Sequence, residues 1–276
     1  MSNPQGLHPR FEIRRLELEH LDWAIAVLCH TNIFDSPVWP AVYPDNLPGR
    51  LIRLFKTCEY FVRHQIESGL SFGVFDTEYK FKRTESESTG GKLYWDLTLD
   101  EGSTAKDVKE TTSQEFLEQM DFPLVSIALS FDAGNPLDGP MVAPVIKTLP
   151  LFGTLEGKFN ALDPRGDSES LQPKELAQVL KRNGTSTRRD YVGFGIMKHL
   201  AHRVMHEAAR RGFQGIQIAC MHDAVIHVWM NPPSPFKAQM LVDLNFKDFE
   251  EEEVEGRLIN YSSIDQRASR IYVHLV

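Results

Sequence analysis

The sequence has few cysteines and no long apolar run. The three cysteines, Cys29, Cys58 and Cys220, lie far apart among 276 residues and cannot all pair. Each falls in an apolar helix or strand pattern, so we expect buried free thiols and a reducing compartment. No apolar run reaches the ~18 residues that a membrane span needs, and the N-terminal segment MSNPQGLHPRFEI lacks the apolar stretch of a secretory signal. The sequence therefore predicts a cytoplasmic protein that does not bind a membrane.

Basic residues and several chemical motifs are also scarce. Lysine and arginine number 30 against 38 acidic residues, and the resulting formal charge of −8 opposes binding to nucleic acid. The chain has no His-Glu-x-x-His, paired Cys-x-x-Cys or Gly-x-Ser-x-Gly motif, so metalloprotease, zinc-finger and serine-hydrolase functions gain no support. It also lacks the third glycine of the dinucleotide fingerprint and the Gly-Lys-Ser/Thr of a P-loop.

The most informative segment is residues 184–215, where a polar stretch runs through DYVGFG (190–195) into a long amphipathic helix. The helix ends at Gly212, and a strand-like segment follows at 216–220. Gly193 and Gly195 leave the backbone amides unobstructed where the helix begins, and free N–H groups at a helix start attract anions. We therefore predict a site for a phosphate or diphosphate; the alternative is a tight turn that binds nothing.

This spacing is similar to motif A of the GCN5-related N-acetyltransferases, in which a Gln/Arg-x-x-Gly-x-Gly/Ala turn holds the diphosphate of coenzyme A. The resemblance implies an α/β fold with a mixed central sheet flanked by helices, and acetyl-CoA or another acyl-CoA as co-substrate. Asp190 stands where the family has Gln or Arg, and the two preceding arginines either neutralise it, contact the phosphates or are ordinary surface charge. The diphosphate-binding residues predicted in this way are Arg188, Arg189, Val192, Gly193, Phe194, Gly195 and Ile196.

The resemblance continues in HDAVIHVW (222–229), where the family has an Asn-x-x-Ala-x-x-Leu-Tyr helix whose tyrosine protonates the leaving thiolate in many members. Residues 11–16 and 21–23 also look like the family's first strand and first helix. Aligned through Val225, Trp229 stands at the tyrosine and His222 at the asparagine. An indole N–H cannot supply a proton at neutral pH, whereas an imidazole titrates near neutrality. We therefore predict Trp229 as core packing and His222 as the catalytic acid or base; the alternative for His222 is a capping or partly buried residue.

Other chemically active side chains have simpler interpretations. His199, His202 and His206 recur at i, i+3 and i+7, a spacing that can hold a metal, but they lie opposite the apolar face of their helix. We therefore expect three solvent-facing histidines and no metal. Cys220 has no adjacent helper except His222, so we expect a structural thiol rather than a nucleophile.

The chain is long for one acyltransferase domain and short for two, which predicts a single domain over residues 1–276 with insertions at about 78–122 and 132–170. Because the insertions are polar or rich in proline, we expect them to lie outside the central sheet. Strands are expected at 11–18, 71–75, 124–131, 179–188, 216–220, 239–246 and 270–276, and helices at 20–30, 51–66, 107–119, 194–210 and 222–229. A loop is expected at 34–49, exposed or disordered chain at 84–91, and a solvated turn at 250–253.

The function that the resemblance implies is acyl transfer from acetyl-CoA or another acyl-CoA to a small-molecule amine or alcohol. Three alternatives stay open, because a fold does not fix a function. The first alternative is a CoA-binding or sensing module without transferase activity. The second is the same fold adapted to another reaction on a thioester or metabolite, and the third is an interaction protein without a pocket. The sequence does not indicate an oligomeric state.

Overall fold

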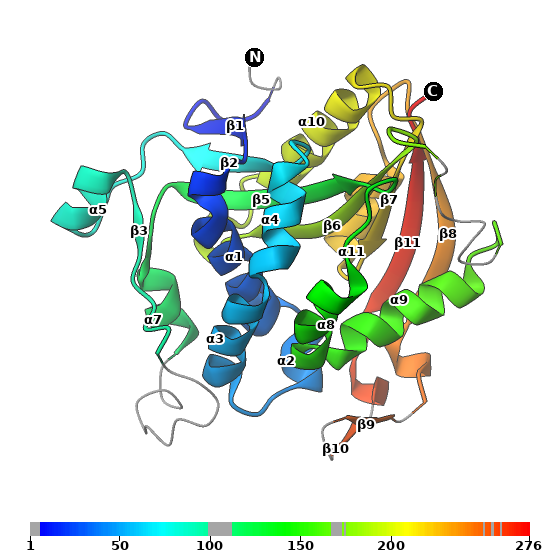
Figure 1. Ribbon diagram of the computed structural model, residues 1–276, viewed down its shortest axis with the longest axis horizontal. Coiled ribbons are helices and arrows are strands. Elements are labelled where there is room, and N and C mark those ends of the chain that lie inside the picture. The colour runs from blue at the N-terminus through cyan, green and yellow to red at the C-terminus, as the bar shows by residue number, and fades with distance from the viewer. Residues whose placement is uncertain are drawn as a thin grey trace.

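A seven-stranded sheet is the framework of the molecule (Figure 1). The computed structural model describes residues 6–98, 112–166, 173, 175–250, 252–254, 257–259 and 261–276. The strand order is β1-β2-β5-β6-β7-β11-β8, and every neighbouring pair is antiparallel except β6 and β7. The strands are β1 (Phe11–Arg15), β2 (Phe72–Asp76), β5 (Leu124–Asp132), β6 (Val179–Thr187), β7 (Gly215–Cys220), β8 (Lys237–Asn245) and β11 (Arg267–His274).

Helices cover both faces of the sheet and enclose two apolar cores. The larger core lies under α1 (Leu21–His30), α3 (Leu47–Thr57), α4 (Glu59–Glu67), α8 (Gly139–Thr148) and α9 (Pro150–Leu162). The smaller core lies under α10 (Ile196–Arg210) and α11 (Asp223–Met230). Strand β5 contributes to both, with Leu124 and Leu129 in the larger core and Val125 and Ala128 in the smaller one. The strand expected at 124–131 is therefore present and is buried on both faces.

Helix α10 owes its position to its apolar face and to two glycines. Ile196, Leu200 and Val204 recur at helical spacing and are buried in the smaller core. Gly195, at φ 70°, precedes the first turn, and Gly212, at φ 87°, follows the last one; both are left-handed conformations that favour glycine. The helix connects β6 to β7, because parallel strands need a crossover rather than a hairpin.

The structure differs from the sequence expectations mainly outside the sheet. Residues 34–49, expected to be a loop, contain α2 (Trp39–Val42) and the start of α3, because both helices place a proline in their first turn, where it is tolerated. The helix expected at 51–66 is two helices that meet at Cys58. The exposed segment 84–91 contains a short helix, α5 (Thr84–Thr89). Glu252–Val254 is a strand, β9, paired with β10 (Arg257–Ile259), where a turn was expected.

The two expected insertions lie beside the sheet. The first carries α7 (Ser113–Glu118), β3 (Lys92–Leu93) and β4 (Met120–Asp121), and these two strands pair only with each other. The second supplies α8 and α9. Residues 107–111, part of an expected helix, lie outside the described residues. Across the described ranges, no helix is long and apolar enough to cross a membrane. The division into one domain with two insertions stays a prediction.

Limited proteolysis tests that division. We expect the first cuts within 78–105 or 132–170, because the seven-stranded sheet leaves out all the described residues of both segments except Asp132. Intact-mass analysis of the first fragments locates each cut. First cuts inside the sheet strands, before either segment is cleaved, would contradict the single-domain prediction.

Candidate functional site

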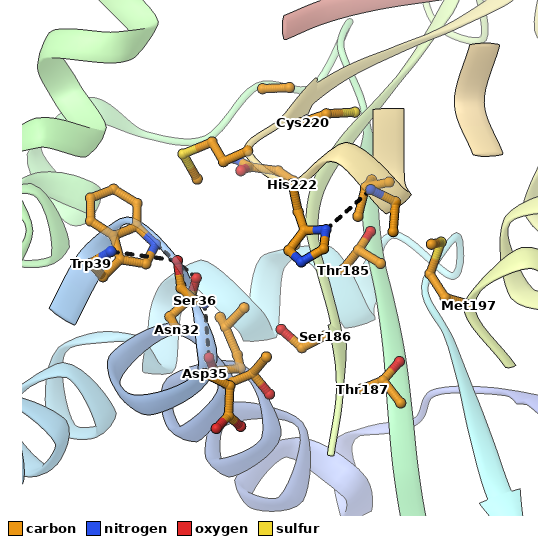
Figure 2. Close-up of a pocket in the computed structure, with 18 of the residues that line it drawn as sticks. Asn32, Asp35, Ser36, Trp39, Thr185, Ser186, Thr187, Met197, Cys220 and His222 are labelled. Carbon is orange, nitrogen blue, oxygen red and sulfur yellow. Dashed lines mark hydrogen bonds between the residues drawn. The ribbon is translucent and has the colours of Figure 1, made fainter. Parts of the chain in front are cut away.

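A cavity of about 720 Å³ opens where the parallel strands β6 and β7 separate (Figure 2). Their ladder ends at the pair Arg182–Ile218, although β6 continues to Thr187 and β7 to Cys220. Residues 183–187 form one wall of the cavity and residues 218–222 the other. Beyond the last pair, the edge of β6 that faced β7 presents backbone groups that can bind a ligand lying between the strands.

A bulge bends β6 at the point of separation. Two β6 residues, Asn183 and Gly184, lie opposite the single β5 residue Leu129, and Gly184 adopts a positive φ of 136°. The guanidinium of Arg182 holds this irregular segment, because it donates to the carbonyl oxygen of Leu129, to that of Gly184 at 3.4 Å and to Thr185 Oγ1 at 2.6 Å. Burial lowers the pKa of Arg182 to about 9.

The predicted glycine turn lies at the mouth of this cavity. Gly193 has φ 94°, and a Cβ atom on Gly193 or Gly195 would meet no other atom within 4 Å. The N-cap residue of α10 is Gly195, which has no side chain to accept from the first N–H groups of the helix, and such groups attract anions. Val192, Gly193, Gly195 and Ile196 line the cavity. Phe194 does not, and its ring packs against Phe11 at 5.6 Å.

The two arginines predicted to contact the diphosphate have protein partners. Arg188 is 1% exposed, donates to the carbonyl oxygens of Met120 and Phe122, each at 3.1 Å, and forms a bidentate pair with Asp190. These contacts leave its guanidinium buried in the fold, which does not fit a phosphate contact. Arg189 is half exposed, and its Nη2 contacts Oδ1 of Asp35 across the cavity mouth. Its side chain can exchange this partner for a ligand.

His222 lies at the start of α11 and caps it. Its Nδ1 accepts a hydrogen bond from the backbone N–H of Ala224 at 3.1 Å, and the exposed ring lines the cavity. A ring nitrogen that accepts carries no proton, so the neutral ring holds its proton on Nε2. In this geometry His222 is a hydrogen-bond donor to a ligand through Nε2–H. To act as an acid it would first lose the cap.

The remaining predicted residues follow the sequence expectations with one exception. Trp229 is fully buried in the smaller core, and Cys220 and the other two cysteines are buried free thiols. Burial raises the pKa of Cys220 far above its ordinary value, so a nucleophilic thiolate is disfavoured. His199 and His202 are partly buried rather than solvent-facing, and burial lowers the pKa of both. They lie on α10, and neither lines the cavity.

Another wall of the cavity comes from residues that the sequence interpretation missed. Helix α1 continues into a π-helix, η2 (Thr31–Asp35), whose residues Thr31, Asn32 and Asp35 line the cavity together with Ser36. The apolar lining includes Leu54, Phe61, Val145, Leu149 and Phe152. The available sequence signal was a group of polar residues directly after the apolar α1 pattern.

Comparison with known proteins identifies the fold. No family model matches the chain, and no curated protein matches its sequence. Among solved structures, the C-terminal condensation domain of Ebony in complex with beta-alanyl-dopamine gives a TM-score of 0.57 at 16% identity, covering 95% of this chain and 97% of that chain. Arylalkylamine N-acetyltransferase 2 from Aedes aegypti gives 0.54 at 12% identity, covering 96% and 99%. A putative arylalkylamine N-acetyltransferase 7 from the same mosquito gives 0.53 at 10%, covering 96% and 88%.

These likenesses extend over nearly the whole chain at low identity, so they show the fold and leave the activity open. The chain has the GCN5-related N-acetyltransferase fold, a mixed sheet flanked by helices. The resemblance inferred from the glycine turn and the helix at 222–229 is therefore confirmed at the level of the fold.

Replacing Arg188 separates a structural role from a ligand contact. We expect Arg188→Met to lower the free energy of unfolding by about 3 kcal/mol, because two buried carbonyl groups and Asp190 lose their donor. The matched change Arg189→Met removes a half-exposed guanidinium from the carboxylate of Asp35 and is expected to cost less than Arg188→Met, about 1–2 kcal/mol. Urea denaturation of both variants measures the difference. A stable Arg188→Met protein that fails to bind CoA would instead indicate a phosphate contact.

Proposed function

We propose that this protein transfers an acyl group, most simply acetyl, from acyl-CoA to the amine or hydroxyl group of a small molecule. The observation that carries the proposal is one continuous cavity that reaches from the glycine turn, between the separated strands β6 and β7, to His222 and the wall formed by η2. A donor and an acceptor can meet only where one cavity serves both.

The chemical groups along this cavity fit such a transfer. Of the predicted turn amides, those of Gly193 to Ile196 would hold the diphosphate at the start of α10, whereas the Val192 N–H already donates to the Arg189 carbonyl oxygen. The unpaired edge of β6 would bind the amide groups of the pantetheine arm, as an added strand does. Arylalkylamine N-acetyltransferases share the fold, which favours an amine acceptor over an alcohol.

The reaction joins the nitrogen of the neutral acceptor to the acyl carbon and breaks the carbon–sulfur bond; the nitrogen releases one proton to solvent, and the sulfur takes up one proton. The position at which the family has its acidic tyrosine is occupied by Trp229, which is buried in the core, so no tyrosine can supply the proton there. His222 is placed to donate a hydrogen bond from Nε2 to the departing thiolate, which lowers the charge cost of its departure. The proton itself then reaches the sulfur from solvent.

Thiol release and binding together test the proposal. Purified protein is mixed with acetyl-CoA and a panel of amines and alcohols, and free CoA thiol is followed with a thiol reagent. Turnover that depends on the acceptor supports the proposal. CoA binding without turnover supports the alternative of a binding or sensing module, which the missing tyrosine favours. No CoA binding overturns both.

The glycine turn gives a sharper test of donor binding. We expect Gly193→Val to weaken CoA binding at least tenfold, or about 1.4 kcal/mol, because a branched side chain would stand at the helix start that the diphosphate approaches. Gly212→Val is the matched control: Gly212 also has a positive φ and open surroundings, but it lies at the other end of α10. Isothermal titration calorimetry measures both. Equal affinity in the two folded variants contradicts this placement.

His222 is tested by a pair of substitutions. We expect His222→Ala to lower kcat tenfold or more with little change in CoA affinity, since a hydrogen bond to a charged group contributes ~1.5–3 kcal/mol. His222→Asn retains a good helix cap but removes the imidazole. If His222 only caps α11, the asparagine variant keeps the full rate while the alanine variant loses stability.

A further inference from the structure

Asp35 is the only carboxylate among the described residues that line the cavity. It ends the π-helix η2, and its side chain is 15% exposed. Both carboxylate oxygens are buried, and within the described part of the chain their contacts are ion-pair contacts with Arg189 and His30 rather than well-aligned hydrogen bonds. A buried carboxylate is costly unless a cation neutralises it.

Two basic side chains lie against this carboxylate. His30 is buried, with Nδ1 at 3.5 Å from Oδ2 of Asp35 and Nε2 at 2.9 Å from the carbonyl oxygen of Ser113. A carbonyl oxygen only accepts, so Nε2 carries the proton and a neutral His30 has none left for Asp35. Arg189, which contacts Oδ1, is then the cation that neutralises Asp35.

The other polar groups beside Asp35 already have partners. The Asn32 side chain donates to the carbonyl oxygen of Leu28 and accepts from Trp39 Nε1, both within 2.9 Å. Ser36 Oγ accepts from the backbone N–H of Val38 at 3.1 Å. Asp35 is therefore the charged group to which a cation entering this part of the cavity would bind.

Arg189 belongs to the donor side of the site. It lies four residues before Gly193, and the turn between them is closed by the Val192 N–H, which donates to the Arg189 carbonyl oxygen at 3.3 Å. Its guanidinium is half exposed, so a ligand can reach it from solvent, and a second cation at Asp35 would offset the loss of the contact. An anion at the start of α10 competes with Asp35 for this arginine.

We propose that Asp35 binds the ammonium group of a cationic acceptor, and that Arg189 occupies Asp35 until an anionic donor draws it to the glycine turn. The proposal rests on the proposed function and names its acceptor as an amine with an apolar body, since Leu54, Phe61 and Phe152 also line the cavity. The amine binds protonated and releases that proton to solvent before its nitrogen attacks the acyl carbon. Donor binding then uncovers the acceptor site, and the two ligands bind cooperatively.

Calorimetry without turnover tests this coupling. Phenethylamine is titrated at pH 7 into the protein alone and into the protein saturated with CoA, which carries no acyl group to transfer. We expect CoA to tighten phenethylamine binding about tenfold, within the range of ordinary allosteric coupling. The neutral probe 2-phenylethanol, which has no charge for Asp35, is expected to bind more weakly and to respond little to CoA.

Three variants assign the effect to named residues. Arg189→Gln should bind phenethylamine without CoA about as tightly as the wild type does with it, and the coupling should disappear. Asp35→Asn should weaken phenethylamine binding about tenfold or more while leaving 2-phenylethanol unchanged. Arg14→Gln is the control, because Arg14 is similarly exposed but pairs with Glu12 on β1, and it should behave like the wild type.

The outcomes separate this proposal from the proposed function. If phenethylamine binds no better than 2-phenylethanol, or if Arg189→Gln leaves its affinity unchanged, the proposal is wrong, whether or not the protein transfers acyl groups. If CoA does not bind, the donor proposal fails, but the Arg189→Gln titration without CoA still decides the role of Asp35. Thermal unfolding identifies a misfolded Asp35→Asn protein, in which case the Arg189→Gln and 2-phenylethanol results decide.

Discussion

The site depends on a buried positive charge that stabilises the bulge in β6 where this strand parts from β7. Arg182 is almost fully buried, and within the described part of the chain none of its hydrogen-bond partners is a carboxylate. It binds carbonyl and hydroxyl oxygens on both sides of the bulge, at Leu129 and Gly184 among others. A fully paired parallel ladder would have used these strand ends for backbone hydrogen bonds. Here a side chain stabilises the irregular segment, and the strand edge beyond it faces a cavity instead.

Two adjacent arginines after β6 show how the fold divides its charges. The backbone N–H of Arg188 donates to Val125 on β5, and its guanidinium turns into the protein and stabilises the carbonyl groups of Met120 and Phe122. Arg189 follows on a short 3-10 turn and faces solvent and Asp35. Adjacent positions in the chain thus point in different directions: Arg188 is a structural cation, and Arg189 is a cation that can change partners. The same turn leads into Gly193, so the exchangeable charge lies next to the proposed phosphate site.

The sequence predicted the elements that have strong periodicity and a single environment. The β5 strand, the amphipathic α10 and the glycine turn were each found near their true positions, because burial and backbone conformation leave a direct trace in residue type. The sequence did not distinguish Arg188 from Arg189, since both are charged residues in a polar stretch and only tertiary contacts separate them. It missed Asp35 for a related reason: a π-helical extension of α1 has no compositional signature, and Pro37 and Pro40 favoured a loop.

Trp229 packs beside Arg182 at the bulge and also stands where the family has its acidic tyrosine. In many members of the acetyltransferase family that this helix resembles, a tyrosine at this point donates a proton to the leaving thiolate. Here the indole is fully buried, and the Arg182 guanidinium lies 5.8 Å from its ring centroid. An aromatic face stabilises a buried cation that has no carboxylate partner, so this side chain helps to stabilise the bulge. Because the Trp229 side chain is buried in this packing, its Nε1–H does not point into the cavity. In the proposed reaction, His222, which presents Nε2–H at the start of α11, is placed to assist the leaving group in place of a tyrosine.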